Sequence, residues 1–437
     1  MKGQTAFVLS RMQKPQASSS FSALTNVAFF RLWVAALASG AAVAADQTAA
    51  RWALIHFSKS AFVISLLSST AALPFLFFTL PAGFLADAVD RRLLLRTINV
   101  WQALVAGALA FLGFRGMLSP ATLLVGSLAL GVGFAFNAPV WTALIPDMLP
   151  EDELPSAATL GSLQMNLSGI VGPALGGFLL AFTSPPVVFG LNAVGFLGVV
   201  AALRGDHHRQ SPAKPPPGAA DRSLADAFHY VRASGVVRAV LARNFLFALF
   251  VSAIPALMPV IALKDLRLAP AMLGLLFACM GTGSVLGGLV LHGWARRYFS
   301  TSRLTFVASA LLAAIYLWMA LIQHNPSCLL VAAMAGAAWT LAASELWLAA
   351  QRAIAPWARG RLNAAVLMLS QGAMAVGGIV WGAAAEGFGT RATLLAIAGL
   401  FVASLALARR WSLDLLDLPA PPPARWTPSD VESVRVN

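Results

Sequence analysis

The sequence predicts an all-α integral membrane protein, with twelve transmembrane helices arranged as two pseudo-symmetric six-helix bundles. Of its 437 residues, 59% are hydrophobic and only 11% are charged, whereas a soluble domain carries about 25% charge. Apolar runs reach 20 residues or more, which suits helices that cross a bilayer and excludes the alternating strands of a membrane barrel. Basic residues recur in alternate connections between these runs, as expected of a multi-pass protein.

Runs of this length predict one helix each. The twelve predicted spans lie near residues 29–56, 61–85, 93–114, 120–144, 157–182, 187–203, 237–262, 270–293, 304–323, 328–350, 362–386 and 391–408.

The basic residues also predict the orientation. If both termini are cytoplasmic, 24 of the 30 Lys and Arg lie inside, Arg51 lies within a span, and the outer loops hold five, which are Lys59, Arg115, Lys264, Arg267 and Arg391. This asymmetry follows the positive-inside rule. The first apolar run is too long for a signal-peptide core, so no cleaved signal is expected. We therefore expect a multi-pass protein of a bacterial inner membrane. The net charge of +13 is spread over short loops, which argues against nucleic-acid binding.

Polar connections divide the chain. Residues 204–236 form its only long polar connection, which includes the Pro-rich segment 214–218 and separates six spans from six. The predicted units are a cytoplasmic N-terminal segment (1–26), an N-terminal bundle (27–203), a cytoplasmic linker (204–236), a C-terminal bundle (237–410) and a disordered cytoplasmic tail (411–437).

The two halves share a weak internal repeat with a period near 205. Duplicated six-helix units with a site at their interface are typical of secondary transporters. The matched positions are Gly83, Arg91 and Arg92 with Gly288, Arg296 and Arg297, at an offset of 205, and Gln164 with Gln371, at an offset of 207.

The span 157–182 contains an unusual cluster of helix-breaking residues, which are Gly169, Gly172, Pro173, Gly176 and Gly177. In water each Gly costs about 1 kcal/mol in a helix and Pro about 3, so close backbone packing is expected to compensate. Gly172 and Gly176 share one face, with counterparts at Gly283 and Gly287 in span 270–293 and at Gly378 and Gly382 in span 362–386. Plain helix packing explains each pair, but glycine faces in related spans favour a sliding contact between the halves.

Acids within spans are the sharpest functional signal, because an ionised Asp at mid-helix costs about 2.5–3.5 kcal/mol on insertion scales. Asp46, Glu345 and Glu386 qualify, with Glu386 near the outer boundary. Gln47 and Arg51 share a helix face, whereas Asp46 and Arg51 do not. Asp46 must therefore meet a partner on another helix, meet water or stay protonated, and each outcome places it on a cavity. Asp46 and Glu345 are candidate proton or substrate sites.

Uncharged polar groups within spans complete the candidate pathway. Gln164, Asn166 and Gln371 suit either solute binding or hydrogen bonds between helices. No phosphate-binding loop of the GxxxxGK[ST] type is present, so an ion gradient is the expected energy source. Nothing indicates a metal site, a cofactor or an enzyme active site.

Two motifs resemble those of the major facilitator superfamily. The segment 83–92, GFLADAVDRR, matches its signature between the second and third helices, and 169–177, GIVGPALGG, resembles the motif of its exporters. Asp90, where Gly is commonest in the signature, together with the segments 138–139, 144–146, 149–154 and 357–361, makes the chain resemble the transmembrane secretion effector branch, which includes enterobactin exporters. The resemblance implies that Asp87 latches onto the start of the eleventh helix and that Arg91 and Arg92 are further inner-gate contacts. The span 120–144 lacks the Arg of many drug–proton antiporters, so their coupling route cannot be transferred.

These observations predict a proton-coupled exporter of a small amphiphilic molecule, such as a siderophore or drug, that works by alternating access. The alternatives are an importer or facilitator with the same fold, and a membrane scaffold or sensor without transport. The expected partners are the substrate, protons and the lipid bilayer, and the protein is expected to be a monomer.

Overall fold

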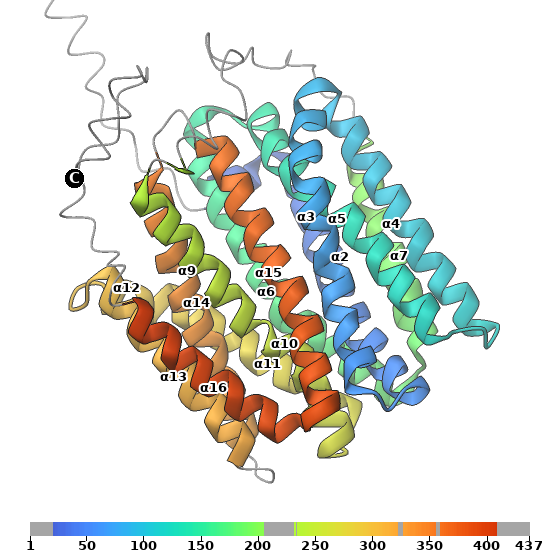
Figure 1. The fold of residues 1–437 in the computed structure, drawn as a ribbon. Helices are drawn as coiled ribbons and strands as arrows, with labels where there is room; N and C mark the ends of the chain where they lie inside the picture. Colours follow the sequence, from blue (N-terminus) through green and yellow to red (C-terminus); the bar gives the residue numbers. More distant parts are fainter. Residues whose placement is uncertain (1–20, 205–230, 233, 322–326, 355–358, 409–437) are drawn as a thin grey trace, which may run out of the picture.

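The computed structural model describes residues 21–204, 231–232, 234–321, 327–354 and 359–408, and all regular structure within them is helical. Figure 1 shows long helices packed side by side, with the first half (blue to green) beside the second (yellow to red). The first half comprises η1 (Ser22–Thr25), α2 (Val27–Phe57), α3 (Ala61–Ala88), α4 (Arg91–Phe114), α5 (Pro120–Met148), η2 (Glu151–Glu153), α6 (Leu154–Phe182) and α7 (Pro185–Ala202).

The second half has two interrupted spans. Its elements are α9 (Gly235–Val251), α10 (Ala253–Pro259), the π-helix η3 (Val260–Asp265), α11 (Pro270–Leu286), the π-helix η4 (Gly287–Leu291), α12 (His292–Ala295), α13 (Thr301–Leu321), α14 (Ser327–Ala353), α15 (Arg359–Phe388) and α16 (Thr390–Ala408). The seventh span runs through α9, α10 and η3, and the eighth through α11, η4 and α12. Proline lacks the amide donor of a regular helix, and Pro255 and Pro259 both lie in the interrupted seventh span.

The predicted span count is confirmed. Eleven spans within the described residues are long and apolar enough to cross a membrane, and α16 supplies a twelfth, shorter apolar helix. Local chemistry sets many of the helix starts: the side chains of Asn26, Ser60, Asp90 and Ser119 each accept a backbone N–H from the first turn that follows.

The packing of the helices repeats between the halves, as the predicted duplication requires. In the first half α2 packs on α6, α3 on α5, and α4 on α7; in the second, α9 packs on α15, α11 on α14, and α13 on α16. Two long contacts join the halves, α3 with α15 and α6 with α11. In the repeat, α3 corresponds to α11 and α6 corresponds to α15. The contact of α3 with α15 is therefore the counterpart of the contact of α11 with α6, and the same pseudo-symmetry relates the two contacts.

Glycine faces form the contacts between the halves, but of the three faces predicted only that of α15 takes part. The prediction that Gly172 and Gly176 meet Gly283 and Gly287 is wrong. Gly172 and Gly176 pack on Ala41, Ala44 and Ala45 of α2, and Gly283 and Gly287 pack on Ala333 and Ala337 of α14, each pair within its own half.

The contact between α6 and α11 uses the neighbouring stripe of α6. A Cβ on Gly177 would lie 3.1 Å from Gly274 Cα, and a Cβ on Gly281 would lie 2.8 Å from the carbonyl oxygen of Gly169. Gly378 and Gly382 of α15 do face the other half, where they meet Ser69 and Ser65 of α3. Helices α6 and α11 therefore touch backbone to backbone, a contact that admits no side chain, whereas the glycines of α15 meet small serine side chains of α3.

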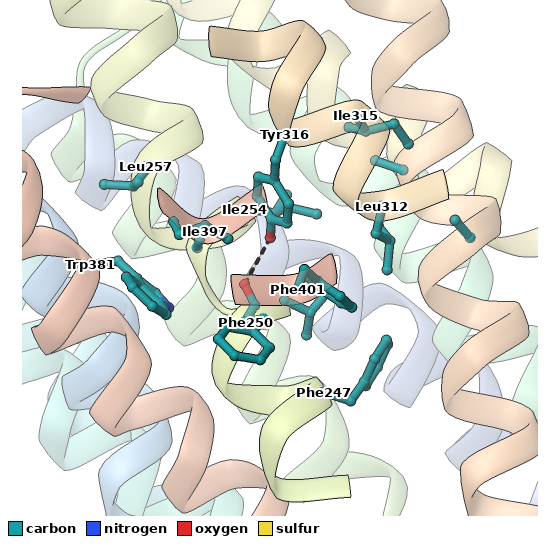
Figure 2. Close-up of a cluster of buried hydrophobic side chains, with 14 of the residues drawn as sticks. Phe247, Phe250, Ile254, Leu257, Leu312, Ile315, Tyr316, Trp381, Ile397 and Phe401 are labelled. Atoms are coloured by element: carbon teal, nitrogen blue, oxygen red, sulfur yellow. Dashed lines mark hydrogen bonds between the residues drawn. The ribbon is translucent and has the colours of Figure 1, made fainter. Parts of the chain in front are cut away.

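Buried aromatic side chains form a core in the second half, beside this interface (Figure 2). The Tyr316 hydroxyl, fully buried, donates to the carbonyl oxygen of Phe250 at 2.8 Å, and the Trp381 indole donates to that of Leu249 at 2.7 Å. Both acceptors lie at the end of α9, where the seventh span is interrupted and helix carbonyls need other donors. Phe401 packs against Phe250 and Tyr316. This core fixes the interrupted span against α13, α15 and α16.

Some expectations fall outside the described residues. These are the N-terminal segment to residue 20, nearly all of the linker 204–236, and the tail from residue 409. The backbone of Asp87 lies in α3, but its side chain is not described, so the predicted latch onto α15 stays a prediction.

Candidate functional site: a central cavity

A cavity of about 1120 Å³ lies between the halves. All six spans of the first half contribute to its wall, whereas the second half contributes Pro255 of α10 and Leu367, Gln371 and Met374 of α15. Most of the lining is apolar. Asp46 and Arg51, both on α2, are the two ionisable residues among the lining residues.

The cavity is closed at the end where α3 begins and α15 ends, which we call the Glu386 side. Glu386 Oε2 accepts the backbone N–H of Ala61, the first residue of α3, at 2.6 Å. Ser65 and Ser68 of α3 donate to the carbonyl oxygens of Ala256 and Pro255, at 3.2 and 3.1 Å.

Two physical effects support this closure. Pro259 has no N–H to offer the carbonyl of Pro255, four residues earlier, so Ser68 satisfies an acceptor that the helix leaves open. A carboxylate at a helix N-terminus gains favourable charge–dipole energy, and Glu386 has that position on α3. These three hydrogen bonds between the halves lie toward this side.

The opposite end, where α3 ends and α4 begins, we call the Arg91 side. The cavity reaches it, because the lining includes Ile145 and Pro146 in the last turn of α5 and Leu154 at the first position of α6. A Cβ on Gly83, near the end of α3, would have nothing within 4 Å. The cavity is therefore continuous toward the Arg91 side and sealed at the other.

Asp46 lies on the cavity wall and is only 4% exposed. The amide of Asn192, on α7, lies beside its carboxyl, although the atoms are not aligned for a hydrogen bond. Within the described residues, Asp46 Oδ1 and both amide atoms of Asn192 are buried without a hydrogen-bond partner. A buried polar group left unpaired costs free energy. Binding of a proton or of a polar ligand group to Asp46 and Asn192 would therefore be favourable, because it would supply the hydrogen bonds that these side chains lack.

Arg51 lines the cavity one turn beyond Gln47 and is 9% exposed. One terminal nitrogen donates to Gln47 Oε1 at a long 3.5 Å, and the guanidinium carbon lies 4.9 Å from the ring centre of Phe277, on α11 of the other half. Its Nε is buried without a hydrogen-bond partner in the described part of the chain. No carboxylate of the described residues forms an ion pair with it.

Of the three uncharged candidate residues, two line the cavity and one does not. Gln164 and Gln371 line the cavity from α6 and α15. Gln164 also donates to the carbonyl oxygen of Ala36 at 3.1 Å, which ties α6 to α2. Asn166 is absent from the lining, and its amide donates to Ser162 O of its own helix at 2.8 Å, so its place in the pathway stays a prediction.

Glu345 is not among the lining residues of this cavity either, so its role as a proton or substrate site also stays a prediction. It is fully buried within the second half, where Oε1 contacts His292 Nε2 at 2.7 Å and Arg296 Nε at 3.4 Å. Its basic partners come from the end of the eighth span. Burial of the acid is compensated at Oε1, as for a structural ion pair, whereas Oε2 is buried without a hydrogen-bond partner among the described residues.

The signature segment 83–92 ties the first half together. Arg91 pairs with Asp147 of α5 at 2.9 Å and donates to Ala86 O at 3.2 Å. Asp90 accepts the backbone N–H groups of Arg92 and Leu93, so the Asp that replaces Gly in this signature caps α4. Asp147 therefore has an ion-pair partner in its own half.

The sequence did not reveal two residues that lie next to the charged cavity residues, Asn192 beside Asp46 and Phe277 beside Arg51. Asn192 is an uncharged polar residue in the middle of span 187–203, a signal of the same kind as Gln164. Phe277 gave no such signal, because an aromatic residue in an apolar span is most often core. Only the packing of α2 against α11 brings its ring to Arg51.

The fold and the cavity define the class: a multi-pass membrane transporter with the major facilitator fold. The fold is similar to that of a bacterial homologue of the human lysosomal transporter Spinster in an inward-facing, unoccupied conformation, with a TM-score of 0.72 and 16% identity over 92% of this chain and 98% of that one.

The chain belongs to the transmembrane secretion effector family, whose model matches residues 18–435. Among curated proteins it is similar to macrolide efflux protein A of Streptococcus pyogenes, 26% identical over 60% of this chain and 65% of the relative. It is also similar to the staphyloferrin A transporter of Staphylococcus aureus, 25% identical over 36% of this chain and 40% of the relative. The matches thus span less than two thirds of the length of these relatives.

Proposed function

We propose that this protein is a proton-coupled exporter of small amphiphilic molecules in a bacterial inner membrane, working by alternating access. The observation that carries the proposal is the cavity: apolar for most of its wall, sealed at the Glu386 side, and carrying a buried acid, Asp46. An apolar cavity with few polar groups suits an amphiphilic solute. Intramembrane acids that face a cavity mark ion or substrate pathways.

The positive-inside rule makes the Arg91 side cytoplasmic, so this conformation is inward-facing. Substrate then enters from the cytoplasm, and a proton leaves Asp46 to the same side. Rocking of the halves about the contacts of α3 with α15 and α6 with α11 exposes Asp46 to the other side, where a proton binds and substrate leaves. The name of the macrolide efflux relative agrees with this direction of transport.

Transport into inside-out vesicles tests the proposal. With the protein in vesicles whose interior is acidified, outward proton flow should drive accumulation of a radiolabelled macrolide above its equilibrium level, and a protonophore should abolish it. Vesicles without the protein are the control. If instead an acid exterior drives accumulation, the protein is a symporter and the direction proposed here is wrong.

Replacing Glu386 with Gln should favour opening on the Glu386 side. The variant loses a charge–dipole interaction at the start of α3 worth about 0.3–1 kcal/mol, so the open population should rise by up to about fivefold. The readout is the labelling rate of a cysteine at Ala50, on the cavity wall, by an impermeant maleimide applied from the Glu386 side, with Cys279 and Cys328 replaced by Ser.

Arg391→Gln is the matched control for this experiment. It also changes an exposed charge on the same side, but no described hydrogen bond joins Arg391 to the first half. The control should label at the parent rate. Equal rates for Glu386→Gln and the parent would show that this contact does not hold the halves closed.

A further inference from the structure

The two ionisable residues of the cavity are opposite in charge, close in sequence and not paired with each other. Asp46 and Arg51 are five residues apart on α2, which separates their Cα atoms by about 7.5 Å along the helix axis. They flank the stripe of α2 that faces the cavity, which includes Val43, Gln47 and Ala50. At 100° per residue, the two side chains leave the helix on opposite sides of that stripe.

Their protein partners leave both groups incomplete. Asp46 is directed toward Asn192 of α7, yet its Oδ1 has no hydrogen-bond partner among the described residues. Arg51 is directed toward Phe277 of α11, and its Nε is likewise without a partner there. A ring face and a long hydrogen bond compensate a buried guanidinium only in part. Neither residue has a counter-charge within the part of the chain that the structure describes, and both line the same cavity.

We propose that the cavity selects zwitterionic amphiphiles, with the cationic group of the substrate at Asp46 and its anionic group at Arg51. Recognition is by charge complementarity across the exposed stripe of α2, and the apolar wall takes the body of the molecule. The proposal rests on the proposed function, and it explains coupling: a substrate cation and a proton compete for Asp46, whereas Arg51 holds the anionic end without taking part in proton exchange.

Three related probes test the assignment. Norfloxacin is a zwitterion at neutral pH with its charges at opposite ends of a rigid ring system; its ethyl ester keeps only the cation, and its N-acetyl derivative keeps only the anion. Equilibrium binding to the purified full-length protein in detergent is followed by fluorescence anisotropy, without any ion gradient. The parent protein should bind norfloxacin about tenfold more tightly than either derivative, the ratio expected for one charge-assisted hydrogen bond.

Each variant should remove one preference only. In Arg51→Gln, norfloxacin and its ester should bind alike, while the preference over the N-acetyl derivative remains. In Asp46→Asn, norfloxacin and the N-acetyl derivative should bind alike, while the preference over the ester remains. Arg115→Gln, an arginine outside the cavity whose guanidinium also lies near an aromatic ring, should keep the parent order.

The proposal is overturned if the parent protein shows no preference for the zwitterion or does not bind it, or if both preferences survive in both variants. Failure of the exporter proposal is a separate outcome. If the protein prefers the zwitterion but shows no gradient-driven transport, the binding proposal holds, and the proposed direction of transport and proton coupling are wrong. If the protein exports substrate in response to a proton gradient but shows no preference for the zwitterion, the exporter proposal holds and the binding proposal is wrong.

Discussion

Replacing Asp46 with Asn is expected to reduce proton-driven accumulation in inside-out vesicles by at least about tenfold, because the cavity loses its one acid and with it the carrier of the proton. Asn has nearly the same shape and can still lie beside Asn192, so the fold should persist. Exchange of labelled for unlabelled substrate across the membrane should continue, since that reaction needs no net proton movement. Loss of accumulation with retained exchange is the expected signature.

Glu345→Gln is the matched comparison. It makes the same chemical change in an acid that is buried with His292 and Arg296 and does not line the cavity. We expect lower thermal stability and retained proton-driven accumulation. The account of coupling is wrong if Glu345→Gln uncouples transport while Asp46→Asn transports like the parent protein.

Replacing Gly274 with Leu should trap the protein away from the described conformation. Any Cβ at Gly274 would collide with the carbonyl oxygen of Pro173 and lie 2.9 Å from Gly177 Cα, so the backbones of α11 and α6 must separate. Overpacking of this kind costs about 1–3 kcal/mol, which shifts a conformational equilibrium by about five- to 150-fold. Transport should fall accordingly.

Two readouts and one control separate trapping from misfolding. Labelling of a cysteine at Ala50 from the Glu386 side should rise in Gly274→Leu, while the protein elutes as a single species from size-exclusion chromatography. Gly399→Leu changes a glycine of α16 that does not line the cavity and whose Cβ would have nothing within 4 Å, and it should transport like the parent. If Gly274→Leu transports like the parent protein, the backbone contact between α6 and α11 has no role in transport.

The sequence was sufficient for the architecture because the bilayer imposes it. Apolar length fixed the number of spans, and the repeat predicted two related halves. Asp46 could be placed on a cavity wall because a lipid-facing acid is too costly. Gln47 and Arg51 follow from its spacing along α2.

Helix rotation could not be predicted in the same way. On α6, Gly172 and Gly176 lie one stripe away from Gly169, Pro173 and Gly177. Both stripes are small enough for close packing, and composition alone does not say which one meets α2 and which meets α11. The reversed assignment of these faces, and the placement of Asn166 on the cavity, have this common cause.

The position of Glu345 away from this cavity could not be predicted for a different reason. Its partners His292 and Arg296 are more than 45 residues away in sequence, and they reach it only because the eighth span packs along α14. An acid in an apolar span is costly when isolated, but the sequence does not reveal whether a buried cation already compensates it.

The central claim is that the halves open alternately at the two ends of one cavity, and paired distances measured by electron spin resonance test it most directly. In protein without native cysteines, one pair of labels at Glu151 and Arg297 reports the Arg91 side, and another at Lys59 and Arg391 reports the Glu386 side; all four are exposed. On moving from substrate-loaded to proton-loaded conditions, the first distance should change in the opposite direction to the second. If both distances stay constant, or change together, alternating access about this cavity is contradicted.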